Sequence, residues 1–481
     1  MIVLYIVLAV LAVFLLVLLF NTIKVTVKGR KLGTYTYWKT EAEQKAYAER
    51  LAQMIRCKSV SVEGSYDDTE FKKQREVVEK LFPLVHEKAE RMIFSDDCWI
   101  YKLEGKDKSR NIMLMSHHDV VAAKGEWKQP PFEGKIVDGV LWGRGTVDTK
   151  TPLFAEFSAL EELLAEGFVP ETNLYIGSSH NEELGGDGIP KAIAYFKEQG
   201  ITFELVLDEG GAVISPPLAG MECRCAMLAV HEKGRHTLNC RAEQGNMHTG
   251  LTQNMDTPVV RMSKFIAEVQ NTKNLFIRRM YPEVKAMFEA LCPYMPFPLR
   301  LVFSNLWCFE GLLVKLIPSI NAAAGSMLGT TCAFNGIQGG KFDGKTHNYC
   351  EATAFLRCVN DADQAKDIAK IKAIADKYAI TVEDAEGNEY YPPADMSKAP
   401  FHYVKETVEK VFPAVAAAPF ILPAGTDARH MTDICDCVIR FAPIDIDDQQ
   451  YASVHSENEN ITLKAIGNAV EFYTQILKNY K

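Results

Sequence analysis

Acidic and imidazole side chains follow short apolar runs at several separated places in this chain. They lie in Ser116-His117-His118-Asp119, at Asp148, in Asn181-Glu182-Glu183, at Asp208 and at His455. Mixed nitrogen and oxygen donors without thiolate suit Zn²⁺, with Co²⁺ or Mn²⁺ as alternatives. Two such metals about 3.5–4 Å apart can share a water, lower its pKa and hold the oxyanion of a tetrahedral intermediate. These residue types therefore predict a two-metal hydrolase.

The adjacent acids Glu182 and Glu183 predict a division of labour, because two neighbouring carboxylates cannot easily serve one ion in the same way. We expect Glu183 to ligate a metal and Glu182 to be the general base that takes a proton from the attacking water. Near the first imidazole, alternation along an extended backbone turns His117 and Asp119 to one side and His118 to the other. Asp119 can then accept the second ring N–H of His117 and fix its tautomer.

Apolar, strand-like runs are expected to place these side chains at one edge of a sheet. The runs are Ile112 to Met115, Leu174 to Gly177 and Phe203 to Leu207. An amphipathic helix with Leu153, Phe157, Leu160 and Leu164 on one face lies between the first two. This alternation predicts an α/β fold with a mainly parallel mixed sheet and helices on both faces.

Five consecutive segments are expected. They are a membrane anchor over 1–22, a linker over 23–39, a first catalytic part over 40–220, an inserted α+β lid or dimerisation domain over 221–362, and a second catalytic part over 363–481. The capping box Thr40-Glu41-Ala42-Glu43 predicts a helix that runs to about Arg56. The lid is expected to hold a helix whose apolar face is Val259, Met262, Ile266 and Val269. The last part is expected to hold a helix over Val404 to Val411 and a terminal helix with Leu463, Ile466, Val470, Tyr473 and Leu477 in phase.

The N-terminus is apolar from Ile2 to Phe20, which is about the length that spans a hydrocarbon core. Since no charge interrupts this run and no small-x-small cleavage site follows it, it is typical of an uncleaved signal anchor; a cleaved secretory signal is the alternative. The basic residues Lys24, Lys28, Arg30 and Lys31 come next. By the positive-inside rule they favour a cytoplasmic catalytic domain.

The net charge argues against one class of partner, and the cysteine spacing argues against two kinds of cysteine site. The formal net charge of −9 and the lack of a Lys and Arg cluster beyond Lys24 to Lys31 argue against nucleic acid. The twelve cysteines are scattered without zinc-knuckle or thioredoxin spacing, which favours reduced core residues.

Six ordered motifs together resemble the di-zinc aminoacylase and carboxypeptidase S family, from about Thr40 to the C-terminus. The motifs are His117-x-Asp119-Val120-Val121, Gly143-Arg144-Gly145-x-x-Asp148-x-Lys150, Asn181-Glu182-Glu183-x-Gly185-Gly186, Asp208-Glu209-Gly210, Gly425-Thr426-Asp427-Ala428-Arg429 and Ser453-Val454-His455. The resemblance implies that one zinc takes His117, Asp148 and Asp208, that the other takes Asp148, Glu183 and His455, and that Asp148 bridges them. It also implies Glu182 as the base.

The resemblance implies further contacts from the inserted domain, which closes over the site as a lid and often dimerises. His248 matches a lid imidazole that stabilises the oxyanion, often in the partner subunit, and Arg357 matches a lid arginine that pairs with a substrate carboxylate. The loop with Gly425 and Thr426 is expected to offer backbone N–H groups to the same carboxylate. Three residues depart from the family pattern, namely Gly344 and His347, where an Asn and a Pro are common, and Asn181, where Asp is usual.

The leading functional hypothesis is a membrane-anchored zinc amidohydrolase that cleaves the amide bond next to a free carboxylate, as a carboxypeptidase or dipeptidase does. The alternative is an N-acyl (fatty-acyl) amino acid hydrolase. A non-catalytic metal-binding scaffold would predict a missing ligand or base, and none is missing. The apolar stretch from Met280 to Ile320 can line an acyl groove, dip toward the bilayer, or form lid core or a dimer interface.

Overall fold

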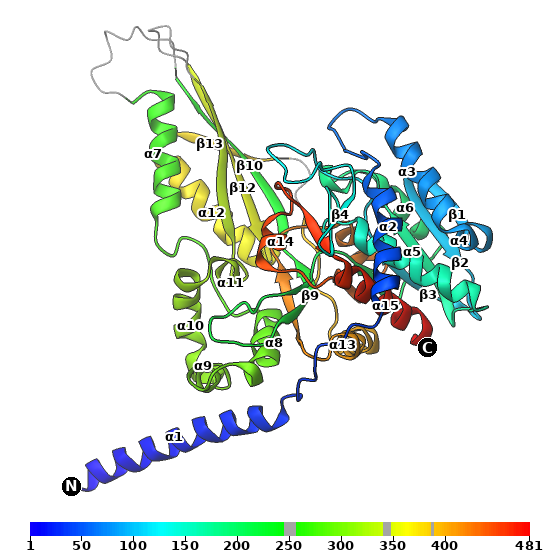
Figure 1. Cartoon of the computed structure of the whole chain (residues 1–481). Helices are drawn as coiled ribbons and strands as arrows, with labels where there is room; N and C mark the ends of the chain where they lie inside the picture. Colours follow the sequence, from blue (N-terminus) through cyan, green and yellow to red (C-terminus); the bar gives the residue numbers. More distant parts are fainter. Residues whose placement is uncertain (245–255, 340–347, 386–388) are drawn as a thin grey trace.

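The computed structural model describes residues 1–244, 256–339, 348–385 and 389–481, and its strands form three sheets in those ranges (Figure 1). The large sheet contains β1 (Glu90–Phe94), β2 (Cys98–Leu103), β3 (Asp107–Met115), β6 (Thr172–Ser178), β7 (Leu205–Asp208), β8 (Val213–Ile214), β9 (Cys225–Glu232), β14 (Ala416–Leu422) and β15 (Val438–Arg440). The small sheet contains β10 (Gly234–Glu243), β11 (Thr331–Gly339), β12 (Tyr349–Cys358) and β13 (Ile380–Asp384). The third contains β4 (Lys135–Val137), β5 (Val140–Trp142) and β16 (Asn460–Thr462).

Helices pack on the large sheet and on one face of the small sheet, and one further helix forms the N-terminus. They are α1 (Ile2–Lys28), α2 (Glu41–Ile55), α3 (Asp68–Leu81), α4 (Pro83–Lys88), α5 (Lys150–Ala165), α6 (Gly188–Glu198), α7 (Pro258–Asn271), α8 (Pro282–Leu291), α9 (Phe297–Phe303), α10 (Leu306–Ile320), α11 (Ala322–Ser326), α12 (Asp361–Lys377), α13 (Ala399–Val411), α14 (Asp448–Ala452) and α15 (Leu463–Asn479). Short 3₁₀ turns are η1 (Glu182–Leu184), η3 (Cys292–Tyr294) and η4 (Asp427–Asp433).

The large sheet is mixed, with a parallel centre. Its order is β1-β2-β6-β3-β7-β15-β9-β14, with β8 beside β9. The neighbours β6, β3, β7 and β15 run parallel, whereas β1 and β2 join their neighbours antiparallel. β9 is antiparallel to β15 and parallel to β14. The carboxyl ends of β3, β6 and β7 therefore meet at one edge. The predicted α/β class is confirmed.

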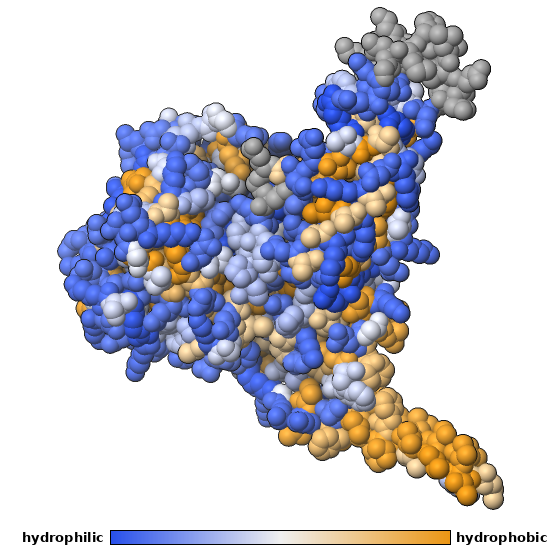
Figure 2. Space-filling model, turned by 180° about the vertical axis from the view of Figure 1, so that it is seen from behind, coloured by the Kyte–Doolittle hydropathy of each residue, from blue (hydrophilic) through white to orange (hydrophobic). Residues whose placement is uncertain are grey.

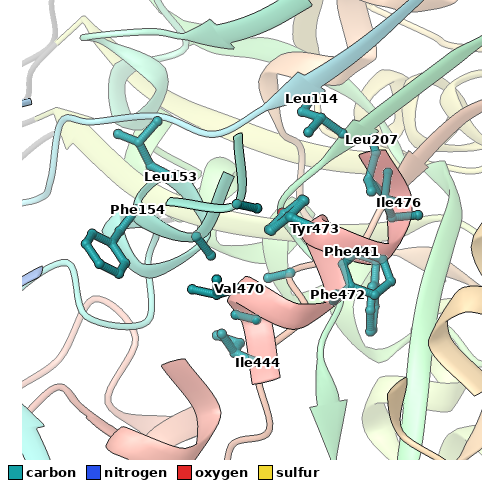
Figure 3. Packing of buried hydrophobic residues seen from close by; sticks show 14 of the residues in the cluster. Leu114, Leu153, Phe154, Leu207, Phe441, Ile444, Val470, Phe472, Tyr473 and Ile476 are labelled. Atoms are coloured by element: carbon teal, nitrogen blue, oxygen red, sulfur yellow. The ribbon is translucent and has the colours of Figure 1, made fainter. Parts of the chain in front are cut away.

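Alternating side chains of β3 enter two separate cores. Ile112 and Leu114 pack with α2, α5, α13 and α15 on one face, and Met113 and Met115 pack with α6 on the other. Figure 3 shows side chains of α15, including Tyr473, pointing toward those of α5 and the strands. Because successive side chains of a strand point to opposite faces, the fully apolar end of β3 can bury both.

The helices expected from the sequence are present. The helix α2 begins at the N-cap Thr40, where the Thr40 hydroxyl accepts the Glu43 N–H and the Glu43 carboxylate accepts the Thr40 N–H. The buried residues of α15 include Ile466, Val470 and Leu477, in phase as predicted. In α7, Met262 and Val269 are buried as predicted, but Phe265 is also buried and Val259 is exposed, so the apolar face is partly turned from the predicted one.

The small sheet does not follow the segment limits expected for the lid. β9, which lies inside the expected 221–362 segment, is buried along its whole length and pairs with β14 in the large sheet. β13, which lies beyond residue 362, pairs with β10 in the small sheet. The small sheet and the helices α7 and α12 that pack on it therefore occupy 234–384. His248, Gly344 and His347 lie outside the described residues.

The helix α1 is apolar and long enough to cross a membrane, and it projects from the end of the molecule where α8, α9 and α10 gather (Figure 1). Its helical backbone continues to Lys28, beyond the apolar run. Its last turns contact α9 and η3. Its N-terminal part extends away from the rest of the chain.

The core under α15 should dominate the stability of the catalytic layer. Phe472 is fully buried among the residues of α5, α15 and β15. Replacing Phe472 by Ala should lower the free energy of unfolding by about 3–5 kcal/mol, because it removes buried area and leaves a cavity. Lys478→Ala on the exposed side of the same helix should change it by less than about 0.5 kcal/mol. Denaturant unfolding measures both changes. Equal losses of unfolding free energy in the two variants would contradict this packing.

Candidate metal centre

Asp148 lies between two imidazoles that come from distant parts of the chain. Its Oδ1 is 2.9 Å from Nε2 of His117, and its Oδ2 is 2.9 Å from Nε2 of His455. Nε2 of His455 is also 3.0 Å from Oε2 of Glu183. One carboxylate thus faces both halves of the site with different oxygens, which is the arrangement a bridging ligand needs.

Two groups of potential ligands share Asp148. The first is His117, Asp148 and Glu209, and the second is Asp148, Glu183 and His455; in each, the ligand atoms lie within 4.8 Å of one another. The donors are imidazole nitrogens and carboxylate oxygens, a set that suits zinc and related divalent ions. Oε1 of Glu183 is buried and has no hydrogen-bond partner among the described residues, so it is available to a cation.

Glu209, not Asp208, completes the first group. The carboxylate of Asp208 instead accepts the backbone N–H groups of Glu209 (2.8 Å) and Ala428 (2.9 Å). Asp208 is the last residue of β7 and is buried at the strand end, where it joins this strand to the 425–429 loop. Glu209 follows the strand and lines the pocket. The adjacent pair offered two candidate acids, and the residue types alone could not separate them.

Asp119 contacts both the ring of His117 and the 3₁₀ turn η1, which carries Glu182 and Glu183. Nδ1 of His117 is 3.0 Å from the backbone oxygen of Asp119 and 3.2 Å from its Oδ1, and the Asp119 carboxylate accepts the N–H groups of Glu182 and Glu183 at 3.2 Å each. His118 lies away from the centre, as the backbone alternation predicts: its ring stacks on Trp99 with centroids 4.0 Å apart. Asp119 therefore orients both a potential ligand and the Glu182-Glu183 pair, through its backbone oxygen and its carboxylate.

Glu459 is a structural residue of the site that the sequence analysis missed. Its carboxylate is fully buried and accepts the backbone N–H groups of Gly145, Val147 and Asp148, besides the guanidinium of Arg144 at 2.6 Å. It thereby joins the loop that carries Asp148 to the segment that follows His455. The signal in the sequence was its position, four residues after His455 and directly before β16.

The electrostatics of the centre follow from burying many acids beside two imidazoles. Burial by itself would lower the pKa of His117, but Asp119 and Asp148 raise it well above its ordinary value. Hydrogen bonds to Asp148 and Glu183 raise the pKa of His455 to about 10. Burial and nearby carboxylates raise the pKa values of Glu182 and Glu209 well above the usual range. Such a site stabilises positive charge, whether proton or metal.

A pocket of about 350 Å³ opens beside the centre. Asp148, Glu182, Glu183, Glu209 and His455 line its polar side. Its apolar side contains Ala212, Leu422, Ala442, Ile444, Ile446 and Val454. The pocket therefore joins reactive groups to an apolar wall.

Of the predicted carboxylate-binding residues, Gly425 and Thr426 line this pocket and Arg357 lies beside Gly425. A Cβ placed on Gly425 would be 3.7 Å from an Nη1 nitrogen of Arg357 and 3.4 Å from Nη1 of Arg429. Burial, followed by the charges of Arg235 and Arg429, lowers the pKa of Arg357. Both donors of Thr426, however, are taken by Glu232: its N–H donates at 3.0 Å and its hydroxyl at 2.8 Å. In this conformation Thr426 does not offer its N–H to a substrate.

Comparison with known proteins agrees with this geometry. A family model described as "Peptidase family M20/M25/M40" matches residues 113–479. The Xenopus tropicalis protein "N-fatty-acyl-amino acid synthase/hydrolase PM20D1" is 29% identical over 450 residues, covering 91% of this chain and 86% of that protein. The Dictyostelium discoideum protein "Probable carboxypeptidase S-like 2" is 28% identical over 481 residues, covering 97% and 92%.

Solved structures share the fold. An M20 metallo-carboxypeptidase, Sso-CP2 from Sulfolobus solfataricus, has a TM-score of 0.65 at 18% identity and covers 90% of this chain and 98% of its own. Human carnosine dipeptidase 1 has a TM-score of 0.61 at 13% identity, covering 91% and 97%. With the family match spanning most of the chain and the paired ligand groups in place, the chain belongs to peptidase family M20/M25/M40, and it is a metal-dependent hydrolase of the peptidase and aminoacylase type.

Proposed function

We propose that this enzyme holds two Zn²⁺ ions and cleaves an amide bond next to a free carboxylate. The observation that carries the proposal is the position of Asp148 between the two ligand groups. One ion would be held by His117, Asp148 and Glu209, and the other by Asp148, Glu183 and His455. Glu209 thus replaces Asp208 in the ligand set implied by the family resemblance, and Co²⁺ or Mn²⁺ suits the same donors.

The residues around the pocket divide the chemical work. When bound, the two metal ions would lower the pKa of the attacking water and stabilise the oxyanion. Glu182 lines the pocket beside both ligand groups, so its carboxylate is positioned to take the proton of that water and deliver it to the leaving nitrogen. Asp119 fixes the backbone of Glu182 and the ring of His117. Both groups are therefore oriented before substrate arrives.

An arginine cluster supports recognition of the substrate carboxylate. Arg235 and Arg357 are cross-strand partners on β10 and β12, and the Arg429 guanidinium lies next to the same glycine, Gly425, as Arg357. Like charges placed directly opposite each other in a sheet are destabilising. Glu232 and Glu389 offset part of this charge, and a substrate carboxylate would offset more of it. A Cβ at Gly425 would lie 3.3 Å from Oε2 of Glu232 and in ordinary contact with the two guanidinium groups, so glycine keeps this part of the rim open.

The second candidate function is hydrolysis of N-fatty-acyl amino acids, and the apolar wall of the pocket favours it. Leu422, Ile444, Ile446 and Val454 offer an acyl chain or an apolar side chain a dry surface. A relative from Xenopus tropicalis bears the name of an N-fatty-acyl-amino acid synthase/hydrolase. In both candidate reactions the arginine cluster would hold the carboxylate, and a water activated at the centre would attack the amide carbon.

We also propose that α1 remains in the mature protein as a membrane anchor. Contacts between α1 and the folded domain support retention, because a signal peptide that is cleaved off does not form them in the mature protein. Asn21 Nδ2 donates to Asn305 at 2.9 Å, and Arg300 donates to Thr26 at 2.9 Å. The basic residues that follow the apolar run favour a cytoplasmic catalytic domain. Pairing of two chains through the small-sheet domain, with His248 reaching the partner's site, stays a prediction of the family resemblance.

Replacing Glu182 by Gln should abolish turnover without emptying the site. We expect kcat to fall about 10²–10⁴-fold, because the general base is lost. Elemental analysis should still find two metals per chain, since Glu182 is in neither ligand group. Glu198→Gln, on the exposed side of α6, is the matched control and should behave as wild type. Unchanged turnover in Glu182→Gln would assign the base to another residue.

Two neighbouring variants should separate the ligand from its support. Glu209→Gln should lower the metal content from two ions toward one, because a first-group donor is lost. Asp208→Asn should retain both ions but lower the melting temperature, because a carboxylate that accepts two backbone N–H groups is replaced by an amide. Metal loss in Asp208→Asn with full loading in Glu209→Gln would instead support Asp208 as the ligand, as the family resemblance implies.

A substrate panel should decide between the two candidate reactions. The purified full-length chain, loaded with Zn²⁺, is given long-chain N-acyl amino acids and dipeptides. Both substrate types carry the same amino acid at the end with the free carboxylate. The apolar wall predicts the higher kcat/KM for the acyl substrates. Leu422→Asp should reduce that preference by about 10-fold or more, as expected for a polar group set against an apolar ligand surface. Higher kcat/KM on dipeptides, insensitive to Leu422, would favour the carboxypeptidase or dipeptidase function.

A further inference from the structure

The helix α10 leaves four large apolar side chains, here termed its exposed row, in contact with solvent, with Trp307 about half a turn around the helix axis from Leu316. Their exposed fractions are Trp307 59%, Leu312 53%, Leu316 44% and Ile320 76%. The residues Leu306, Leu313 and Ile317 on the other side are buried in the core shared with α8 and β14. A helix that buries one apolar face and exposes a second is not explained by packing within one chain.

This exposed row continues the surface of α1. The Phe14 and Trp307 rings meet edge to face with centroids 5.9 Å apart. Phe297, at the start of α9, is also exposed by 56%. In the view of Figure 2, the hydrophobic surface of α1 runs on into hydrophobic patches at the end of the molecule from which it projects.

Polar contacts between α1 and the α9–α10 junction mark a level along α1. Thr22 Oγ1 lies 3.0 Å from Ser304 Oγ, and Asn21 donates to Asn305. These are the first polar residues after the apolar run, and basic residues follow them. In a spanning α1 this level corresponds to the boundary between hydrocarbon and head groups.

Trp307 lies on the hydrocarbon side of that level. With an axial rise of about 1.5 Å per residue, Phe14 is about 10 Å along α1 from Asn21, toward the N-terminus. Trp307 contacts Phe14 and is therefore at a similar depth. Amphipathic helices that lie in a membrane interface bury their apolar face by about 5–10 Å. Lys315, the exposed charge within the row, has a long stem that lets its ammonium reach the head groups.

We propose that α9 and α10 are seated in the same leaflet that α1 enters, with the exposed row of α10 in contact with acyl chains. The inference rests on the proposed anchoring through α1. A bilayer is the occupant that the α1 contacts favour, because Phe14 and Trp307 share one apolar surface across two elements. Attachment at both α1 and α10 would fix the orientation of the enzyme on the membrane, which one helix and a linker cannot do.

Lipid quenching of tryptophan emission tests the proposal. The full-length chain is reconstituted into phosphatidylcholine vesicles with or without brominated acyl chains, and its attachment is checked by flotation. Brominated lipid should reduce the emission of wild type, Trp307→Phe should lose most of that reduction, and Trp127→Phe, on the catalytic side near Arg144, should keep it.

The outcomes separate this inference from the anchoring beneath it. A chain that floats with the vesicles but whose quenching does not depend on Trp307 overturns the seating of α10 and leaves the α1 anchor standing. A chain that does not float overturns both. Efficient cross-linking of two chains through the exposed Cys308, without lipid quenching, would place a second copy on this surface and overturn the proposal.

Discussion

The contact of one carboxylate with two imidazoles is the constraint on which this structure depends. Asp148 meets His117 from the end of β3 and His455 from the segment before β16, so residues more than three hundred positions apart must be held to hydrogen-bond precision. The parallel centre of the large sheet brings the first half of the site to one edge. Glu459 then joins the Asp148 loop to the C-terminal half through three backbone N–H groups.

Concentrating so many acids in a buried site is costly without a compensating charge. The raised pKa of His455 and the raised pKa values of Glu182 and Glu209 are the signs of that cost. A pair of divalent ions held by the two ligand groups would supply that charge. Farther out, the arginines around Gly425 supply the opposite charge, and a substrate with a free carboxylate would lie between the two regions.

Much of the fold followed from sequence because local signals agreed with the tertiary environment. The capping box at Thr40 and the apolar phases of α5 and α15 predicted real helices, and the backbone alternation after β3 correctly separated His117 and Asp119 from His118. These predictions depend only on periodicity and short-range geometry. The packing of α10 against α1 involves two distant segments, so the apolar stretch from 280 to 320 left several interpretations open.

The failures share a physical cause, which is that they concern how side chains pair across distant segments. Asp208 and Glu209 are both acids at a strand end, and only the position of the Ala428 N–H shows which one is used for support. Thr426 was expected to face substrate, but Glu232, nearly two hundred residues away, takes both of its donors. The limits of the inserted domain shifted because β9 resembles any other apolar strand until its partner β14 is known.

Anomalous X-ray diffraction at the zinc edge, on crystals of the zinc-loaded full chain, would show whether Asp148 lies between two metals. Two peaks about 3.5–4 Å apart are expected, with a different oxygen of Asp148 directed at each. Each peak should lie about 2.0–2.2 Å from its carboxylate and imidazole ligands. A single peak, or a pair that Asp148 does not separate, would contradict this arrangement.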